Sequence, residues 1–323
     1  MQIRHRRLRK NHAIRAMVQE NHISASDFLV PLFIVEGSGI KEEIPSMPNY
    51  FRMSLDNIQK EVKELWDLGL KSVLLFVKVP DNLKDNKGTE AINPNGLMPR
   101  SIKAVKEACS EMQVFTDVAM DPYSSFGHDG IVEEGEIIND DTVKVLAKMS
   151  VIHAQAGADF VAPSDMMDGR IGAIREALEE ANFVNTGIMS YSAKYASAFY
   201  GPFRDALDSA PGFGDKRTYQ MDPANATEAV KEIIDDSNEG ADLIMVKPGM
   251  PYLDIVALAK QTTDLPIAVY QVSGEYAMIK AAAEKGWLNE EDAMMESIMC
   301  IKRAGAKIIA SYFAKDIAKL LKK

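Results

Sequence analysis

Two lysines attract attention because each closes a hydrophobic, strand-like run. Lys247 ends the run from Ala241, and Lys194 lies just after the run from Thr186 to Ser192. Burying an ammonium is unfavourable, and burial or a second ammonium nearby lowers its pKa. A lysine that is a free amine at neutral pH can attack a carbonyl carbon and form an imine. The spacing alone does not distinguish one such nucleophile from two, and either lysine could instead be an ordinary exposed charge.

A group of carboxylates follows the third strand-like run. Asp117, Asp121 and Asp129 lie there, with His128 beside the last of them. Oxygen donors without cysteine suit Mg²⁺ or another hard cation better than zinc. The alternative is a hydrogen-bonded cluster that binds a substrate ammonium or helix N-termini. The sequence contains no His-Glu-x-x-His and no Gly-x-Ser-x-Gly pattern, so hydrolase chemistry of those two types has no support.

A long connection, at about 200–221, separates the fifth strand-like run from the next helical pattern. It contains three cations, Arg204, Lys216 and Arg217, among several glycines and prolines. Connections of this length are usually functional or disordered. We expect an active-site lid that meets an anion, with a mobile surface loop as the alternative.

Elements that could position these residues alternate regularly along the chain. Eight strand-like runs are separated by amphipathic helical patterns, which predicts parallel strands joined by right-handed crossovers. Eight units favour an α/β fold, the (β/α)8 TIM barrel, over an open doubly wound sheet. Gly37-Ser38-Gly39 after the first run is too short for a dinucleotide-binding loop. The predicted strands are Phe28–Ile34, Ser72–Val79, Val114–Met120, Asp159–Ser164, Thr186–Ser192, Ala241–Lys247, Pro266–Ser273 and Lys307–Phe313.

Catalytic groups of such barrels lie where the strands end, at the C-terminal face. This rule brings the two lysines and the aspartates to one mouth, together with side chains from the other strand ends. Pro31 weakens the first predicted strand, because proline is rare in central strands. The other candidates at the mouth are Ser164, Asp165, Asp168, Ser192, Tyr270, Gln271, Ser273, Ser311 and Tyr312.

Composition limits the possible partners and location. The chain has 323 residues and a net charge of -10, which fits one large domain and argues against nucleic acid as the main partner. Two distant cysteines, Cys109 and Cys300, give no disulfide framework or zinc knuckle, so a reducing cytoplasm is expected. No apolar run is long enough to span a membrane.

The N-terminal segment is unusually basic. Residues 4–10 carry cations and no acid, which is compatible with a transit peptide, a nucleic-acid arm or an arm packed on another subunit. We expect residues 1–25 to be an arm for subunit contacts and residues 26–323 to form the catalytic barrel.

The segments around the two lysines carry a family resemblance. The blocks MVKPGMPYLD and YSAKYASAFYGPFR resemble those of the porphobilinogen synthase (5-aminolevulinate dehydratase) family. This resemblance implies that two 5-aminolevulinate molecules condense to porphobilinogen, in tetrapyrrole and haem biosynthesis, with one imine on Lys247 and one on Lys194. It extends over nearly the whole chain, through residues 162–169, 219–225 and 270–276.

The resemblance also implies roles for other residues. Asp117 and Ser164 would contact the substrate amino group or assist proton transfer. Arg204 and Lys216 would bind one substrate carboxylate, and Ser273 and Tyr312 the other. Tyr191 and Asp168 complete the predicted substrate-binding set.

The expected metal follows from a difference between this sequence and the zinc-dependent members of the family. Zinc-dependent members have three cysteines where this chain has Ala119, Asp121 and Asp129. The chain therefore resembles the magnesium-responsive branch, in which Glu232 corresponds to an allosteric Mg²⁺ site, while Asp121 and Asp129 remain candidate ligands for an active-site cation. The family further implies a homo-octamer in which N-terminal arms embrace neighbouring subunits.

Two other functions fit the same residues. A class I aldolase or lyase would use one Schiff-base lysine on the same fold. A catalytically silent barrel could serve as a binding scaffold, since a fold does not determine a function.

Overall fold

In the part of the chain that the computed structural model describes, residues 2–207, 212 and 214–322, eight parallel strands close into a barrel. The order is β12-β11-β10-β9-β8-β5-β4-β1, and pairing of β12 with β1 closes the ring. All eight predicted strands and the predicted (β/α)8 barrel are thereby confirmed. The strands are β1 Phe28–Val35, β4 Ser72–Lys78, β5 Gln113–Val118, β8 Phe160–Pro163, β9 Gly187–Lys194, β10 Leu243–Lys247, β11 Ile267–Gln271 and β12 Ile308–Ser311.

Pro31 lies within β1 without breaking the barrel. On one side β1 pairs with β4 from Leu29 to Val35, including Pro31 opposite Leu74. On the other side β12 pairs only as far as Leu29, and the short strand β3 (Phe51–Met53) begins to pair at Phe33. Proline, which lacks an amide hydrogen, therefore occupies the gap between two neighbours on the same side.

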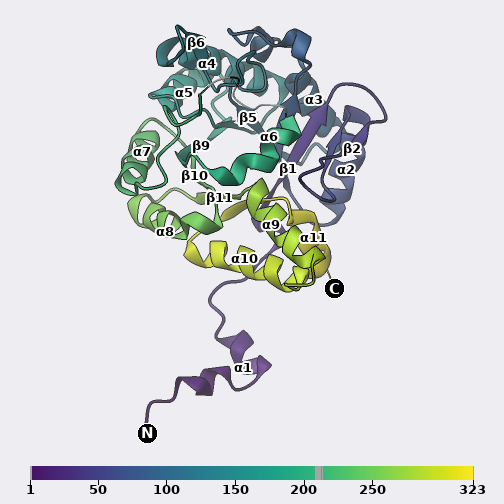
Figure 1. Ribbon diagram of the computed structural model, residues 1–323, viewed down its shortest axis with the longest axis vertical. Helices are drawn as coiled ribbons and strands as arrows, with labels where there is room; N and C mark the ends of the chain where they lie inside the picture. Colours follow the sequence, from purple (N-terminus) through teal and green to yellow (C-terminus); the bar gives the residue numbers. More distant parts are fainter. Residues whose placement is uncertain (1, 208–211, 213, 323) are drawn as a thin grey trace.

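Helices surround the barrel and connect successive strands, as Figure 1 shows. The amphipathic patterns between the predicted strands form helices, although the pattern at 101–112 belongs to a helix, α3, that begins four residues earlier, at Leu97, and ends at Ala108. Pro99 lies in its first turn, where the amide hydrogen has no partner within the helix. The helices are α2 Leu55–Asp67, α3 Leu97–Ala108, α4 Asn139–Ala156, α5 Arg170–Glu180, α7 Thr227–Asn238, α8 Leu253–Thr262, α9 Ser273–Glu284, α10 Glu290–Ala304 and α11 Ala314–Leu321.

The predicted lid region begins as a helix. The 3-10 turn Ala198–Tyr200 leads into α6, Gly201–Leu207, which packs against α9. The middle of the predicted lid, residues 208–211 and 213, lies outside the described residues. Two short hairpins escaped prediction because their strands have only three residues each: β2 Lys41–Glu43 with β3, and β6 Ile131–Glu133 with β7 Glu136–Ile138.

The first residues project from the barrel as an arm. The 3-10 helix His5–Arg9 and α1, His12–Met17, lie well away from the rest of the chain in Figure 1. Neither contains a buried residue, and Ile3 and Met17 are 73% and 80% exposed. Among the described helices, none is long and apolar enough to cross a membrane.

Candidate active site

A register shift between β9 and β10 brings the two lysines together. Ile244 pairs with Ser190, but Val246 pairs with Ala193, so β9 holds one extra residue at this point. Beyond this bulge Lys247 pairs with Lys194. Successive side chains of a strand point to opposite faces, so without the extra residue the two lysines would not share one face.

Lys247 is buried among aromatic rings. Its Nζ lies 4.6 Å from the ring centroid of Tyr270, 5.0 Å from that of Phe203 and 5.1 Å from that of Tyr200. Burial, with a further contribution from Lys194, lowers the pKa of Lys247 to about 7. A substantial fraction of this side chain is therefore a free amine at neutral pH, as nucleophilic attack requires.

Lys194 is buried in a more polar part of the same mouth. Its Nζ donates to the carbonyl oxygen of Ser164 and lies 3.9 Å from Oδ2 of Asp129. Asp129 also faces Lys216, at 3.2 Å. Although burial alone would raise the pKa of Asp129, Lys216 and Lys194 hold it below its usual value. This carboxylate thus balances two cations, one from β9 and one from the predicted lid.

Asp117 and Ser164 form a hydrogen-bonded pair beside the lysines. The Ser164 hydroxyl donates to Oδ1 of Asp117 at 2.7 Å, across the neighbouring strand ends of β5 and β8. Burial, and then the charge of Asp121, raise the pKa of Asp117 to about 7. An acid with this pKa can both accept and release a proton at neutral pH.

These groups line one narrow cavity of about 30 Å³, roughly the volume of one water. Most of the predicted site residues are therefore brought together. Residues that were not predicted from the sequence also line the cavity. Gln220 lies within residues 219–225, which resemble the family, so this signal could have found it. The aromatic residues have no sequence signal beyond their hydrophobicity. The lining is Phe76, Asp117, Asp121, Asp129, Ser164, Lys194, Tyr200, Phe203, Arg204, Lys216, Gln220 and Lys247.

Two of the three cations of the predicted lid, Lys216 and Arg204, differ in their surroundings. The Nζ of Lys216 lies 3.2 Å from carboxylate oxygens of both Asp121 and Asp129. Arg204 is exposed at the cavity and has no ion pair within the described residues. Its guanidinium can therefore receive a carboxylate with two parallel hydrogen bonds.

Three predicted substrate-binding residues do not line this cavity but lie next to residues that surround Lys247. The Ser273 hydroxyl accepts from the Phe203 amide at 2.9 Å, and the hydroxyls of Tyr312 and Tyr270 are 2.9 Å apart. Tyr191 lies within the bulge, with its ring centroid 5.4 Å from Nζ of Lys247. No hydrogen-bond partner reaches its buried hydroxyl within the described part of the chain.

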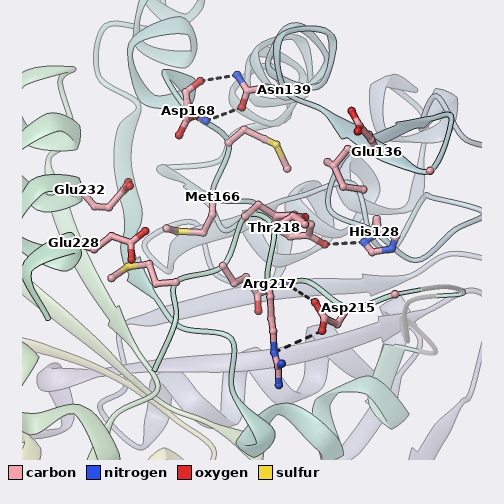
Figure 2. Close-up of a pocket in the computed structure, with 17 residues that line it drawn as sticks. His128, Glu136, Asn139, Met166, Asp168, Asp215, Arg217, Thr218, Glu228 and Glu232 are labelled. Atoms are coloured by element: carbon pink, nitrogen blue, oxygen red, sulfur yellow. Dashed lines mark hydrogen bonds and ion pairs between the residues drawn. The ribbon is translucent and has the colours of Figure 1, made fainter. Parts of the chain in front are cut away.

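The structure does not bring Asp168 to the lysines. β8 ends at Pro163, and the turn before α5 carries Asp168 to the surface, where its backbone exchanges hydrogen bonds with the Asn139 side chain. It lines a second, larger pocket with Glu228 and Glu232 (Figure 2). The sequence rule failed here because it assigns every polar residue after a strand to the mouth, whatever direction the turn takes.

The second pocket shares a wall with the first. Figure 2 shows Glu228 and Glu232 directed into the pocket from α7, opposite Arg217 and Thr218. The segment 215–221 thus separates the two pockets, with Lys216 on the lysine side. Burial raises the pKa of Glu232 to about 7.

The two candidate metal positions differ in their chemistry. Glu232, Glu228 and Asp168 offer oxygen donors in a wide pocket, which suits Mg²⁺ carrying several of its own waters. Asp121 and Asp129 do not fit a cation in this arrangement, because the Lys216 ammonium takes up both carboxylates. Within the described residues, no group of three or more His, Cys, Asp or Glu side chains is close enough to hold an ion directly.

Comparison with known proteins identifies the family. The family model described as delta-aminolevulinic acid dehydratase matches residues 2–320. The chain belongs to this family. Its chloroplastic relative from Glycine max is 55% identical over 98% of the chain and 77% of the relative, and the chloroplastic one from Chlamydomonas reinhardtii is 52% identical over 98% and 84%.

A solved member of the dehydratase family has the same structure. The crystal structure of delta-aminolevulinic acid dehydratase (porphobilinogen synthase) from Toxoplasma gondii, in complex with the reaction product porphobilinogen, is 52% identical with a TM-score of 0.98. It matches 99% of this chain and 92% of its own. The fold described above is therefore that of the family.

One prediction is contradicted by these relatives. The cytoplasm was expected, whereas the curated dehydratases from Glycine max, Chlamydomonas reinhardtii and Oryza sativa are chloroplastic. Two free cysteines indicate a reducing environment but do not distinguish one reducing compartment from another, so the predicted compartment was wrong.

We expect Asp117→Asn to lower the pKa of Lys247 further, by up to about one unit, because the Asp117 charge favours the ammonium form. Below its pKa a lysine is protonated and unreactive, so the acid limb of Lys247 labelling should move to lower pH. Labelling with acetic anhydride, followed by mass spectrometry, measures this limb. Asp168→Asn, outside the cavity, is the control and should leave it in place; an upward shift in Asp117→Asn would contradict the assignment.

Proposed function

We infer that the chain is a porphobilinogen synthase, a lyase that condenses two molecules of 5-aminolevulinate to porphobilinogen with loss of two waters. The observation that carries this function is the pairing of Lys194 with Lys247 in one buried cavity, in a chain that matches the family over nearly its full length. Two adjacent amines can hold two carbonyl substrates at once, which removes much of the entropic cost of bringing them together. The cavity, about 30 Å³ in this structure, must widen to admit them.

The two lysines would act through imines. Each amine attacks the ketone carbon of one substrate, and the carbonyl oxygen leaves as water. The imine makes that carbon more electrophilic and acidifies the neighbouring C–H bonds, as a carbon–carbon bond-forming step requires. Later attack by an amino group on one imine carbon closes the ring and frees one lysine, and elimination of the other lysine amine, with loss of a proton from the neighbouring carbon, frees the second. Overall one C–C bond and one C–N bond form, and two waters leave.

Asp117 and Ser164 lie where protons must move. Asp117 has a pKa of about 7 and accepts a hydrogen bond from the Ser164 hydroxyl, and the Ser164 carbonyl oxygen in turn accepts one from the Lys194 Nζ. We assign this pair to contact with the substrate amino group and to proton transfer. Proton transfer is most effective when the acid's pKa lies near the working pH.

Substrate carboxylates would be held at two places. Arg204 and Lys216 approach from the lid side, and both line the cavity. Ser273 and Tyr312 lie on the other side, next to the aromatic residues around Lys247. Tyr191 completes this second subsite, because its buried hydroxyl has no hydrogen-bond partner among the described residues.

We also propose a regulatory Mg²⁺ at Glu232. The carboxylate faces a pocket that offers oxygen donors. Burial raises its pKa because it disfavours the negative charge, and a bound cation would compensate that charge. Such a cation supplies positive charge to the acidic α7 face. The wall shared with the catalytic cavity gives the site a physical connection to Lys216, and the absence of cysteine in the sequence at positions 119, 121 and 129 favours the magnesium-responsive branch.

The assembly proposed is a homo-octamer built through the N-terminal arms. The arm exposes Ile3, Leu8 and Met17, which is unfavourable unless they pack on another surface. The same residues carry a basic run, Arg4 to Lys10, which complements the acidic barrel.

We expect both lysines to be trapped by 5-aminolevulinate and borohydride. Reduction converts each imine to a stable secondary amine, and peptide mass spectrometry locates the adducts. Lys194→Met and Lys247→Met should each lower kcat by about three orders of magnitude or more, because each removes a nucleophile. Exposed Lys63, as Lys63→Met, is the control. Adducts on neither lysine would refute the mechanism, and an adduct on only one, with turnover retained, would favour a single-imine aldolase.

Chelation should lower activity in a way that Mg²⁺ restores, with little response to zinc. Glu232→Gln should weaken the Mg²⁺ response at least tenfold in midpoint concentration, since it removes a charged oxygen ligand. Exposed Asp235→Asn, on the same helix, is the matched control. Activity recovered with Zn²⁺ alone would be incompatible with this proposal.

Removal of residues 1–20 should reduce the assembly to smaller oligomers, because the apolar arm contacts are lost. Sedimentation velocity measures the mass in solution. The control is the full chain with Lys10→Ser, which keeps the apolar arm side chains. A truncated chain that still sediments as an octamer would argue against the arm as the source of assembly.

A further inference from the structure

Glu275 is a buried carboxylate that the proposed reaction leaves without a role. It lies in the first turn of α9 and is 2% exposed. Within the described residues it has no ion pair; its pKa, raised to about 7 by burial, is held down only by backbone amides. A buried acid without a cationic partner is costly unless its hydrogen bonds are satisfied.

Three backbone amides satisfy it. Oε2 accepts from the amide of Val272 at 2.7 Å and from that of Gly249 at 3.1 Å. Oε1 accepts from the amide of Met250 at 2.6 Å. All three contacts use the oxygens as acceptors, which is the role of an ionised carboxylate.

These amides belong to two different loops. Val272 immediately precedes Ser273, the first residue of α9, whereas Gly249 and Met250 follow Lys247 by two and three residues. The carboxylate therefore joins the end of β10 to the end of β11. Lys247 is held further by its carbonyl oxygen, which accepts from the Tyr195 amide at 3.0 Å and the Tyr200 hydroxyl at 3.2 Å.

The loop after Lys247 fits closely against Glu275 because residue 249 is glycine. A Cβ at this position would lie 3.1 Å from Ile301 Cδ1, 3.2 Å from the Tyr270 carbonyl oxygen and 3.3 Å from Glu275 Oε1. A side chain here would force the loop or these neighbours to move by a few tenths of an ångström. Gly249 thus allows the loop to approach Glu275 closely enough for its amides to bind the carboxylate.

We propose that Glu275 is a positioning residue that fixes the Lys247 amine and Ser273 relative to each other. The inference rests on the proposed function, in which Lys247 forms an imine and Ser273 binds a substrate carboxylate. Glu275 touches neither substrate nor the reacting atoms; it acts by holding two backbone segments. Such support matters because misplacement of a reacting group by about 1 Å can cost a hundredfold in rate.

The test compares the two lysines within one protein. Purified full-length chain is incubated briefly with 5-aminolevulinate and borohydride, and the ratio of Lys247 to Lys194 adducts is measured by mass spectrometry. Glu275→Gln places an amide N–H against backbone donors, so we expect this ratio to fall roughly tenfold, with a similar loss in kcat. Lys194 is held by other contacts and should react as before.

The matched control separates positioning from general destabilisation. Asn289→Ala removes the cap of α10, whose side chain accepts from the Asp292 amide at 3.0 Å, and should lower Tm by a few degrees. Its adduct ratio should stay at the wild-type value. A wild-type ratio in Glu275→Gln, or an equal fall in both variants, would overturn the proposal.

A second variant covers the case in which Glu275→Gln does not fold. Gly249→Ala displaces the loop while leaving Val272 and the α9 cap intact, so it should lower the same ratio, and an unchanged ratio would overturn the proposal. Failure of the underlying function gives a different result, because wild-type protein would then form adducts on neither lysine.

Discussion

The arrangement of the site depends on one extra residue in β9. Two parallel strands in regular register would place Lys247 opposite Ala193, with Lys194 directed to the other side of the barrel wall. The bulge removes this mismatch and leaves two amines side by side. Tyr191 and Ser192, which lie in the bulge between the paired residues Ser190 and Ala193, are buried, and their hydroxyls have no described partner. Local irregularity is thus concentrated where the chemistry occurs, as is common for bulges near active sites.

The buried charges at the mouth of the barrel are balanced by contacts between Asp129 and two lysines. Lys194 and Lys216 converge on Asp129, one from β9 and one from the segment 215–221, so the position of that segment and the balance of the buried charges are coupled. Lys247 lies instead among aromatic rings, which supply a weakly attractive surface without a counterion. The two amines are therefore unequal: one is paired with a carboxylate, and the other is poised to lose its proton.

Much of this organisation could be predicted from the sequence. The strands were recognisable as continuous runs of buried Val, Ile and Leu, and both lysines stood at the ends of such runs. The bulge could not be predicted, because a strand buried on both faces has no alternation to reveal its register. Asp168 was misplaced because the direction of a turn depends on contacts such as those with Asn139. Glu275 was missed as a functional residue because its partners are backbone amides, which have no sequence signature.

The similar pKa values of Asp117 and Lys247 have a consequence for proton transfer within the site. Burial raises the pKa of the acid and lowers that of the amine until both lie at about 7. Transfer of a proton between two groups whose pKa values lie this close costs little free energy in either direction. Imine formation, carbon deprotonation and release of water each require a proton at one moment and its removal at another. A mouth buffered in this way can exchange protons internally, so successive steps need not wait for solvent to supply or remove them.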